Sequence, residues 1–344
     1  MSTKALIMAG GMGTRFWPKS TADKPKQFLK ITSDRTMIQE TFARINHLIP
    51  GEDIYLVTNK DHENYIFDQL DVPKENVLLE PAMRNTAAAI GYGMVFLDMD
   101  DILIVLPSDH YIADVERYLE TLRVAIEFAM TNDALITLGI KPTRPETGYG
   151  YIEVTDVSPQ LMRVYPVKRF REKPNLETSY TYLETGRFFW NSGMFIFKVS
   201  VMEEAFKMYM PRLYEAIQTM KMFRGKENFS GIVGDEYEKL ESISIDYGVL
   251  ERAANVYVIP SEFGWSDVGS WDALYELSVK DSTGNHIEAK EAVVRDTSNC
   301  MILAEGKRVA IAHVENLIVI TDDDTILIMK RGTSQDVKMI AKKG

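Results

Sequence analysis

The chain has 344 residues, 45% of them apolar and 26% charged, and this length favours about two domains of ~150 residues each. The formal net charge of −11 argues against general nucleic-acid binding, which needs a basic surface, although a small phosphate ligand needs only a local basic pocket. The single cysteine, Cys300, excludes an intrachain disulfide and a Cys-rich metal site. The five histidines show no ligand-like spacing, so no zinc site is expected.

The N-terminal stretch MSTKALIMAGG carries one lysine, and its apolar segment is too short for a signal peptide. No apolar run in the sequence approaches the roughly 20 residues that cross a bilayer. We therefore expect a cytoplasmic protein that does not bind a membrane.

Short β-rich runs alternate with helical patterns through the first half of the chain. Strands are expected at Ala5–Ala9, Ile54–Thr58, Val77–Leu79, Ile102–Leu106 and Ala134–Gly139. Helices are expected between them, at Thr36–Leu48, Asn85–Leu97 and Val115–Met130. This alternation predicts an α/β fold, in which a mainly parallel sheet is covered by helices on both faces.

The pattern changes twice in the second half. From about Gly148 to Lys173 the sequence is extended, which indicates an inserted β-region, and helix-forming sequence resumes at Val201–Met222. A turn-rich stretch, Lys280–Asn285, then precedes five short apolar runs: AVV, MIL, VAIA, LIVI and ILIM. We predict a first domain at residues 1–284 and a small all-β domain at residues 285–344.

The stretch LIMAGGMGTRFWPKSTADKPKQFL, residues 6–29, places three glycines in four positions directly after the first expected strand. Such loops often bind phosphate through their backbone N–H groups. A dinucleotide fingerprint would need a third glycine where Phe16 stands, and a Walker A loop would need Gly-Lys where Arg15 and Phe16 stand. A glycine-rich turn without a ligand is the alternative, but Arg15, Lys24 and Lys26 concentrate positive charge here.

This stretch resembles the signature of the sugar-1-phosphate nucleotidyltransferases, and its WP…KQFL part is most similar to the mannose-1-phosphate guanylyltransferases. Nine later stretches match in the same order: EPAMRNTAAAI, LPSDHYI, GYGYIE, FREKP, WNSGMFIF, SIDYGVLE, WSDVGSWDAL, VENLIVI and SQDVK. The resemblance covers nearly the whole chain. It implies a Rossmann-like nucleotidyltransferase sheet, a β-helix-like C-terminal domain, and a reaction that joins a sugar 1-phosphate to a nucleoside triphosphate with release of pyrophosphate.

The resemblance also implies roles for the glycine-rich stretch. Its backbone would surround the β- and γ-phosphates, with nucleotide contacts from Ala9, Gly10, Gly11, Gly13 and Thr14. Arg15 would hold the leaving pyrophosphate, and Lys26 would contact the α-phosphate and stabilise its transition state. Lys24 lies outside the matched core of the motif and is interpreted as a solvated charge.

Two aspartates are candidate ligands for Mg²⁺, a hard cation that proteins bind with one or two carboxylates plus substrate phosphates. Asp109 follows the apolar strand ILIVLP, and ligands of open α/β sheets lie beyond the carboxyl ends of strands. Asp267, in WSDVG, matches the second metal ligand of the family. The alternative for each aspartate is a helix N-cap, because helical sequence follows both.

Glu80 is the candidate for base recognition. Relatives that use thymidine or uridine triphosphate carry glutamine with glycine in this region, and this chain departs toward the guanylyltransferase pattern. Guanine presents two adjacent donors, N1–H and the 2-amino group, which one carboxylate can accept together. Arg84 and Asn85 are further candidates for the base or the ribose. The alternative is a surface ion pair between Glu80 and Arg84, which would contribute little stability.

For the sugar 1-phosphate, the resemblance points to five residues: Gly150, Glu172, Lys173, Asn191 and Asp246. The glutamate can accept hydrogen bonds from paired sugar hydroxyls, and the neighbouring ammonium can meet the phosphate. The asparagine lies in a small-residue turn, WNSG, that would let its amide face a pocket.

The expected activity is transfer of GMP from GTP to mannose 1-phosphate, which gives GDP-mannose and pyrophosphate and depends on Mg²⁺. Another sugar 1-phosphate or nucleotide is the nearest alternative. A non-catalytic regulatory paralogue and a nicotinamide dehydrogenase are less well supported. We expect a homodimer that needs the segment after Asn285, and no C-terminal isomerase activity of the kind found in fused family members.

Overall fold

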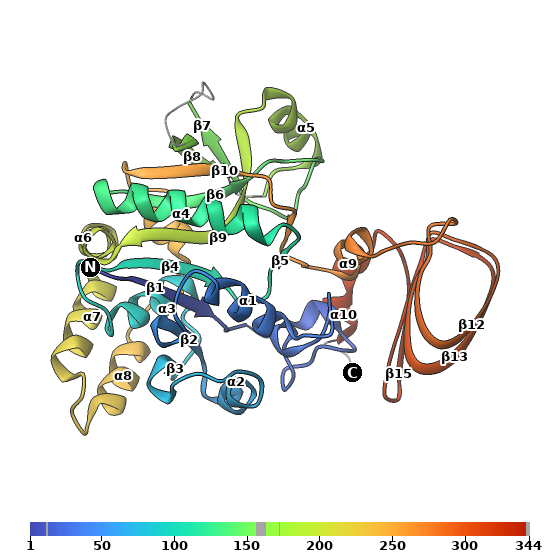
Figure 1. Cartoon of the computed structure of the whole chain (residues 1–344), viewed down its shortest axis with the longest axis horizontal. Coiled ribbons are helices and arrows are strands. Elements are labelled where there is room, and N and C mark those ends of the chain that lie inside the picture. Colours follow the sequence, from blue (N-terminus) through green and yellow to red (C-terminus); the bar gives the residue numbers. More distant parts are fainter. Residues whose placement is uncertain (12, 156–162, 172, 342–344) are drawn as a thin grey trace. The chain divides into compact units, whose positions relative to one another are not determined.

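The computed structural model describes residues 1–11, 13–155, 163–171 and 173–341 (Figure 1). The chain packs as two compact units. The first unit contains the segments Met1–Gly10, Thr41–Ser108 and Ile112–Trp265. The second unit contains Gly11–Glu40, Asp109–Tyr111 and the chain from Ser266 onward. The glycine-rich stretch therefore packs, from Gly11 onward, with the C-terminal part of the chain. The division expected between residues 284 and 285 stays a prediction.

A mixed sheet forms the centre of the first unit. Within the described residues its nine strands are, in spatial order, β3 (Val77–Glu80), β2 (Ile54–Asn59), β1 (Thr3–Met8), β4 (Ile102–Pro107), β9 (Phe188–Lys198), β6 (Leu135–Ile140), β10 (Val256–Ser261), β8 (Tyr165–Arg171) and β7 (Tyr151–Val154). The first four are mutually parallel, as are β6 and β10, whereas β9 is antiparallel to both of its neighbours, β4 and β6. The predicted strands, the inserted β-region and the mainly parallel sheet are thus confirmed.

Eight α-helices precede β10 in the described chain: α1 (Met37–Asn46), α2 (Glu63–Gln69), α3 (Asn85–Met94), α4 (Val115–Thr131), α5 (Leu176–Thr185), α6 (Val199–Tyr209), α7 (Pro211–Phe223) and α8 (Phe229–Glu238). The helical stretch expected at Val201–Met222 is two helices. Met210 leaves the helical region with φ −136° and ψ 60°, because the ring of Pro211 disfavours helical backbone before it. Among the described residues, no helix is long and apolar enough to cross a membrane.

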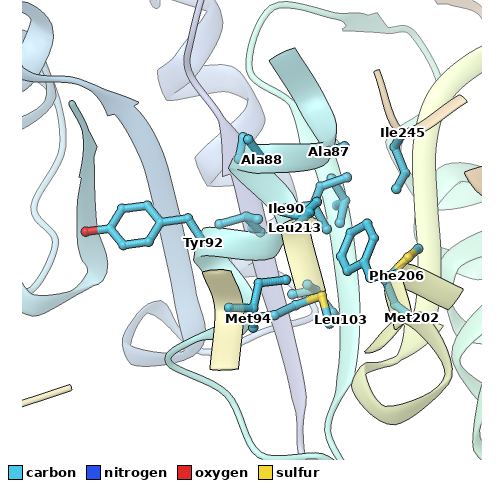
Figure 2. Packing of buried hydrophobic residues seen from close by; sticks show 14 of the residues in the cluster. Ala87, Ala88, Ile90, Tyr92, Met94, Leu103, Met202, Phe206, Leu213 and Ile245 are labelled. Carbon is cyan, nitrogen blue, oxygen red and sulfur yellow. The ribbon is translucent and has the colours of Figure 1, made fainter. Parts of the chain in front are cut away.

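Helices cover both faces of the sheet. Leu103 points from β4 toward α3, α6 and α7, where it shares a buried cluster with Phe206 and Leu213 (Figure 2). Leu6 of β1 belongs to the same cluster. The alternate residues of these strands face the other way, where α4 packs on β4, β6, β9 and β10. α3 packs very close to β1, since a Cβ at Gly93 would lie 2.6 Å from a methyl carbon of Leu6.

The second unit is built around four strands: β12 (His286–Ser298), β13 (Met301–Glu315), β14 (Leu317–Asp322) and β15 (Thr325–Lys330). The first three pair in parallel although they are consecutive, and β15 is antiparallel to β14. The C-terminal β domain is confirmed, with two differences: the runs MIL and VAIA lie on the same strand, β13, and a short helix at Val337–Ala341 follows the strands.

The core of the second unit joins these strands to the glycine-rich stretch. Phe16 and Met37 pack with Trp271 of α9 (Trp271–Leu277), with apolar residues of β13, β14 and β15, and with Val337 of α10 (Val337–Ala341). The chain passes from one unit to the other after Gly10, within α1, after Ser108, and at the short strands β5 (Tyr111–Ile112) and β11 (Trp265–Ser266). The loop predicted to bind phosphate is therefore supported by the C-terminal strands.

Candidate active site

The loop after β1 depends on two glycines. Gly11 has φ +102° and Gly13 has φ +54°, a left-handed region that side chains disfavour. A Cβ at Gly13 would also lie 2.6 Å from the backbone nitrogen of Lys26. The loop then enters a single 3₁₀ turn, Thr14–Phe16, which carries Arg15. Glycine at position 11 allows the left-handed backbone, and glycine at position 13 also lets the loop approach the segment that holds Lys26.

Two buried polar side chains hold this loop. The hydroxyl of Ser20 donates to the carbonyl of Gly13 (2.7 Å) and accepts from the N–H of Phe16 (3.1 Å). The amide of Gln27 donates to the carbonyl of Gly11 (3.3 Å). Both side chains are at most 2% exposed. Sequence reasoning missed them as functional residues, although both lie in the stretch that carries the motif.

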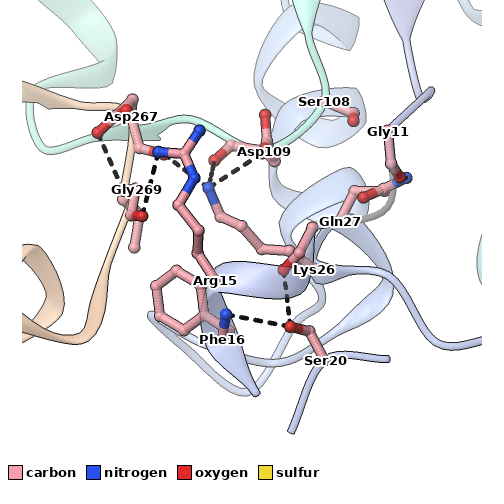
Figure 3. Close-up of polar contacts among 12 residues, drawn as sticks. Gly11, Arg15, Phe16, Ser20, Lys26, Gln27, Ser108, Asp109, Asp267 and Gly269 are labelled. Atoms are coloured by element: carbon pink, nitrogen blue, oxygen red, sulfur yellow. Dashed lines mark hydrogen bonds and ion pairs between the residues drawn. The ribbon is translucent and has the colours of Figure 1, made fainter. Parts of the chain in front are cut away.

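Lys26 connects three segments of the second unit (Figure 3). Its ammonium donates to the carbonyl of Asp109 (2.9 Å), to Oδ2 of Asp109 (3.0 Å) and to the carbonyl of Asp267 (2.6 Å). An ammonium has three N–H donors, so the protein uses all of them. The Lys26 side chain is 5% exposed and that of Asp109 34%. The structure thus brings these three predicted residues together.

Burial by itself raises the pKa of Asp109, but the charges of Lys26, His110 and Arg15 and the hydrogen bond from Lys26 outweigh it. The pKa of this carboxyl is therefore below its ordinary value, and Asp109 is ionised at neutral pH. An ionised carboxylate is the form that binds a metal ion.

Gly269 lies between Arg15 and Asp267. Its carbonyl accepts from the Arg15 guanidinium (3.3 Å), and its N–H donates to Oδ1 of Asp267 (2.9 Å). A Cβ at this position would lie 2.6 Å from Asp267 Oδ2 and 3.0 Å from the Arg15 guanidinium, so glycine keeps both side chains in place.

Neither candidate metal ligand is a helix N-cap. The cap of α9 is Ser270, whose side chain accepts from Ala273, and the cap of α4 is Asp114, whose side chain accepts from Arg117. The N-cap alternative is therefore excluded for both Asp109 and Asp267.

The donor set suits Mg²⁺. Asp109 and Asp267 supply hard carboxylate oxygens, and Lys26 holds the backbone of both. Within the described chain, no group of three or more His, Cys, Asp or Glu side chains could hold a metal by itself. An ion here would complete its coordination with water and phosphate oxygens, as Mg²⁺ does in nucleotide sites.

In the first unit, Glu80 ends β3 and is 8% exposed. Burial raises its pKa to about 7, and a hydrogen bond from the Tyr237 hydroxyl to Oε1 (3.2 Å) acts in the opposite direction. The other oxygen, Oε2, lies toward Gly10, where an added Cβ would be 3.9 Å from it. Preceding Gly10, Ala9 is fully buried and donates its N–H to Val57.

Arg84 and Asn85 have local roles. The Arg84 guanidinium donates to the carbonyls of Tyr237 (2.9 Å) and Glu238 (3.2 Å), so it holds the end of α8 and does not form the surface ion pair considered for Glu80. Asn85 is exposed at the start of α3 with φ +69°, and its side chain accepts from the N–H of Thr86. Its predicted contact with the nucleotide stays a prediction.

Three of the residues predicted to bind the sugar phosphate lie together in the first unit. The Asn191 amide donates to Asp246 (2.7 Å), and the Asn191 N–H donates to the carbonyl of Gly150 (2.9 Å). The side-chain oxygen of Asn191 accepts from Thr137 (3.4 Å), which sequence reasoning missed. Asp246 begins a π-helix, Asp246–Leu250, an element that is frequent at functional sites.

The structure says less about the other two sugar-phosphate candidates, Lys173 and Glu172. Lys173 is exposed. Glu172 lies outside the described residues. The sugar-phosphate roles of all five candidates stay predictions.

Two known families match this chain. Residues 4–284 match the family described as Nucleotidyl transferase, and residues 290–343 match the MannoseP isomerase/GMP-like beta-helix domain. The chain is 37% identical over 349 residues to a mannose-1-phosphate guanylyltransferase of Escherichia coli K12, covering 98% of this chain and 72% of that protein.

Solved structures of similar proteins also match the fold of this chain. A crystal structure described as a mannose-1-phosphate geranyltransferase from Thermus thermophilus is 34% identical, with a TM-score of 0.88, and covers 100% of this chain and 99% of that chain. A structure described as a mannose-6-phosphate isomerase from Helicobacter pylori is 27% identical, with a TM-score of 0.64, and covers 77% of this chain and 100% of that chain.

Proposed function

This chain belongs to the nucleotidyl transferase family, and from that premise we propose that it transfers GMP from GTP to α-D-mannose 1-phosphate. The products are GDP-mannose and pyrophosphate. The observation that carries the proposal is the Lys26 cluster, in which a buried ammonium links two aspartates of the second unit. Such a cluster suits phosphoryl chemistry, where catalysis is mostly positioning and charge stabilisation.

In the proposed reaction, an oxygen of the sugar phosphate attacks the α-phosphorus of GTP in line. The bond from that phosphorus to the α,β-bridging oxygen breaks, and pyrophosphate leaves with the electron pair. The N–H groups of the glycine loop and the Arg15 guanidinium hold the negative charge of the leaving group. Asp109 and Asp267 would hold Mg²⁺, which supplies neutralisation of phosphate charge when bound.

Lys26 has a more demanding role than its motif implies. All three of its donors bind protein oxygens, so contact with the α-phosphate requires that one of these hydrogen bonds be exchanged. The bond to Oδ2 of Asp109 is the one that we expect to be exchanged, because this carboxylate would also hold Mg²⁺. In this proposal the ammonium holds Asp109 until substrate binds and then turns one donor to the phosphate.

Base selection is proposed to come from Glu80. Its ionised carboxylate accepts from guanine N1–H and the 2-amino group, a pair of donors that adenine and the pyrimidines lack. Sugar selection is proposed for Asn191 and Asp246, whose mutual hydrogen bond fixes the amide. Lys173 is the proposed partner of the sugar phosphate.

The test is a grid of nucleoside triphosphates against sugar 1-phosphates, read as pyrophosphate release in the presence of Mg²⁺. The proposal expects the highest kcat/KM for GTP with mannose 1-phosphate. A higher kcat/KM for another pair would change the substrates and keep the reaction. No release with any pair, at a protein concentration that binds GTP, would support a non-catalytic sugar-nucleotide binder.

We also propose that the protein is a homodimer through its C-terminal strands. Ile326 and Ile328 are 63% and 65% exposed on β15, which is an edge strand of its sheet. Apolar edge strands favour pairing with another chain. Because these strands share a core with Phe16, truncation would damage the glycine loop; the better test is Ile326→Lys with Ile328→Lys. Light scattering should then report a monomer that keeps its melting temperature, and an unchanged mass would contradict the proposal.

A further inference from the structure

Tyr237 lies on α8, 157 residues from Glu80 in sequence, and is fully buried. Its hydroxyl oxygen is 3.2 Å from Glu80 Oε1 and 3.3 Å from the carbonyl oxygen of Ala88. A phenol has one proton, so it donates to one of these two acceptors at a time. An ionised carboxylate is the stronger acceptor of the two.

The position of Tyr237 is held independently of its hydroxyl. Arg84 donates to its backbone carbonyl, and its ring packs edge-on against the ring of Tyr92, with 5.8 Å between centroids. Loss of the hydroxyl alone would therefore leave the ring in place. Tyr92 itself extends from α3 away from Phe206 and Met202 (Figure 2).

We propose that Tyr237 is a positioning residue for base selection: its hydroxyl orients the Glu80 carboxylate and stabilises the ionised form that accepts from guanine. With Oε1 held by the phenol, Oε2 lies on the side of Gly10, which begins the glycine-rich stretch and has no side chain to cover it. This inference rests on the proposed role of Glu80.

Few titratable groups face Glu80, so the effect of Tyr237 on its pKa can be tested. Burial raises the pKa of Glu80 to about 7, and the hydrogen bond from Tyr237 is the contact that lowers it. In the described chain, the titratable groups that face Glu80 are Tyr237 on α8 and Tyr92 on α3. Burial raises the pKa of Tyr92 to about 12 and that of Tyr237 well above its ordinary value, so both stay neutral in the working range.

The experiment measures kcat/KM for GTP between pH 6 and pH 9.5 in wild type and in Tyr237→Phe. Because kcat/KM reports the ionisation of the free enzyme, wild type should rise with a midpoint near pH 7. In Tyr237→Phe the midpoint should move upward by about one to two pH units, since a hydrogen bond to a charged group is lost. At pH 7 the variant should be roughly 5- to 50-fold slower, and above pH 9 it should approach wild type.

Tyr92→Phe is the matched control, because it removes a buried phenol hydroxyl that faces Glu80 without an observed hydrogen bond to it. Its midpoint should equal that of wild type. The ratio of variant to wild-type kcat/KM removes the ionisation of the substrates, which is common to all the proteins.

Two outcomes would overturn the inference: an unchanged midpoint in Tyr237→Phe, or an equal loss at every pH. Glu80→Gln separates this from failure of the proposed base role. If Glu80→Gln keeps both the pH profile and the preference for GTP over inosine triphosphate, the base role itself is wrong. If it loses both while Tyr237→Phe does not shift, only the role of Tyr237 is wrong.

Discussion

Asp109 in the second unit and Glu80 in the first are both carboxylates held by one principal partner, yet their pKa shifts are opposite. Asp109 meets the ammonium of Lys26, and its pKa lies below the ordinary value. Glu80 meets the neutral phenol of Tyr237, and burial raises its pKa to about 7. Burial acts in the same direction on both groups, so the charge of the partner decides the sign.

The opposite pKa shifts of Asp109 and Glu80 match their proposed roles in metal binding and base recognition. A carboxylate that binds Mg²⁺ must be ionised at all working pH values, and a cationic neighbour ensures this. A carboxylate that recognises a base needs oriented hydrogen-bond acceptors in a site that excludes water. A cation there would compete with guanine for the same oxygens. Substitutions at each of the two carboxylates test these roles.

The largest effect is expected from Asp109→Asn. Loss of a proposed metal ligand costs several kcal/mol of transition-state stabilisation, so kcat should fall by two or more orders of magnitude. Loss of the ion pair with Lys26 should cost no more than about 1–2 kcal/mol of stability. Asp114→Ala is the control, since it removes the true N-cap of α4 and should cost about 1 kcal/mol of stability without loss of activity. A variant Asp109→Asn that melts early and turns over normally would contradict the catalytic role.

An intermediate effect is expected from Glu80→Gln. The amide turns one acceptor into a donor that faces the donors of guanine, and kcat/KM for GTP should fall by about one to two decades. Inosine triphosphate lacks the 2-amino group and should lose less. Glu75→Gln, at an exposed position, should change neither value. Equal losses for the two nucleotides would remove Glu80 from base recognition.

Glu80→Gln should also remove a pH dependence from the free energy of unfolding. The folded carboxyl keeps its proton to about pH 7, whereas the unfolded one releases it near 4.5. The folded state therefore binds the extra proton between these values, and the wild-type free energy of unfolding should fall with rising pH across them. Relative to Glu80→Gln the fall should reach about 3 kcal/mol between pH 4.5 and pH 8, measured by urea unfolding. A constant difference would contradict the raised pKa.

The smallest effect is expected on the stability of Lys26→Met. At pH 7 the variant should be less stable by about 1–2 kcal/mol, less than for a fully buried pair because 34% of the Asp109 side chain is exposed. Since the folded pKa of Asp109 is lowered, this stabilisation exists above the ordinary value of 3.8 and is lost as the pH falls through the folded pKa. The difference from wild type should therefore shrink below pH 3.8, whereas Lys24→Met, at an exposed lysine, should show no difference at any pH.

The sequence by itself determined the local features of this protein. Apolar runs and helical periodicity located the strands and helices of the first unit, because both patterns repeat over a few residues. The glycines at 11 and 13 mark the loop in the sequence because both have a left-handed backbone, and because Gly13 also lies too close to Lys26 for a side chain. The exceptions were also local: Pro211 divides one expected helix, and two apolar runs continue as one strand, β13.

Only the tertiary structure decided which distant residues contact Lys26 and Glu80. Lys26 meets residues 83 and 241 positions away, and Tyr237 meets Glu80 across 157 positions. No local pattern marks such pairs, because a buried tyrosine in an amphipathic helix has the same sequence signature whether its hydroxyl meets a carboxylate or a carbonyl. The sequence could therefore name the two carboxylates, but their opposite pKa shifts depend on which distant side chain the fold brings to each.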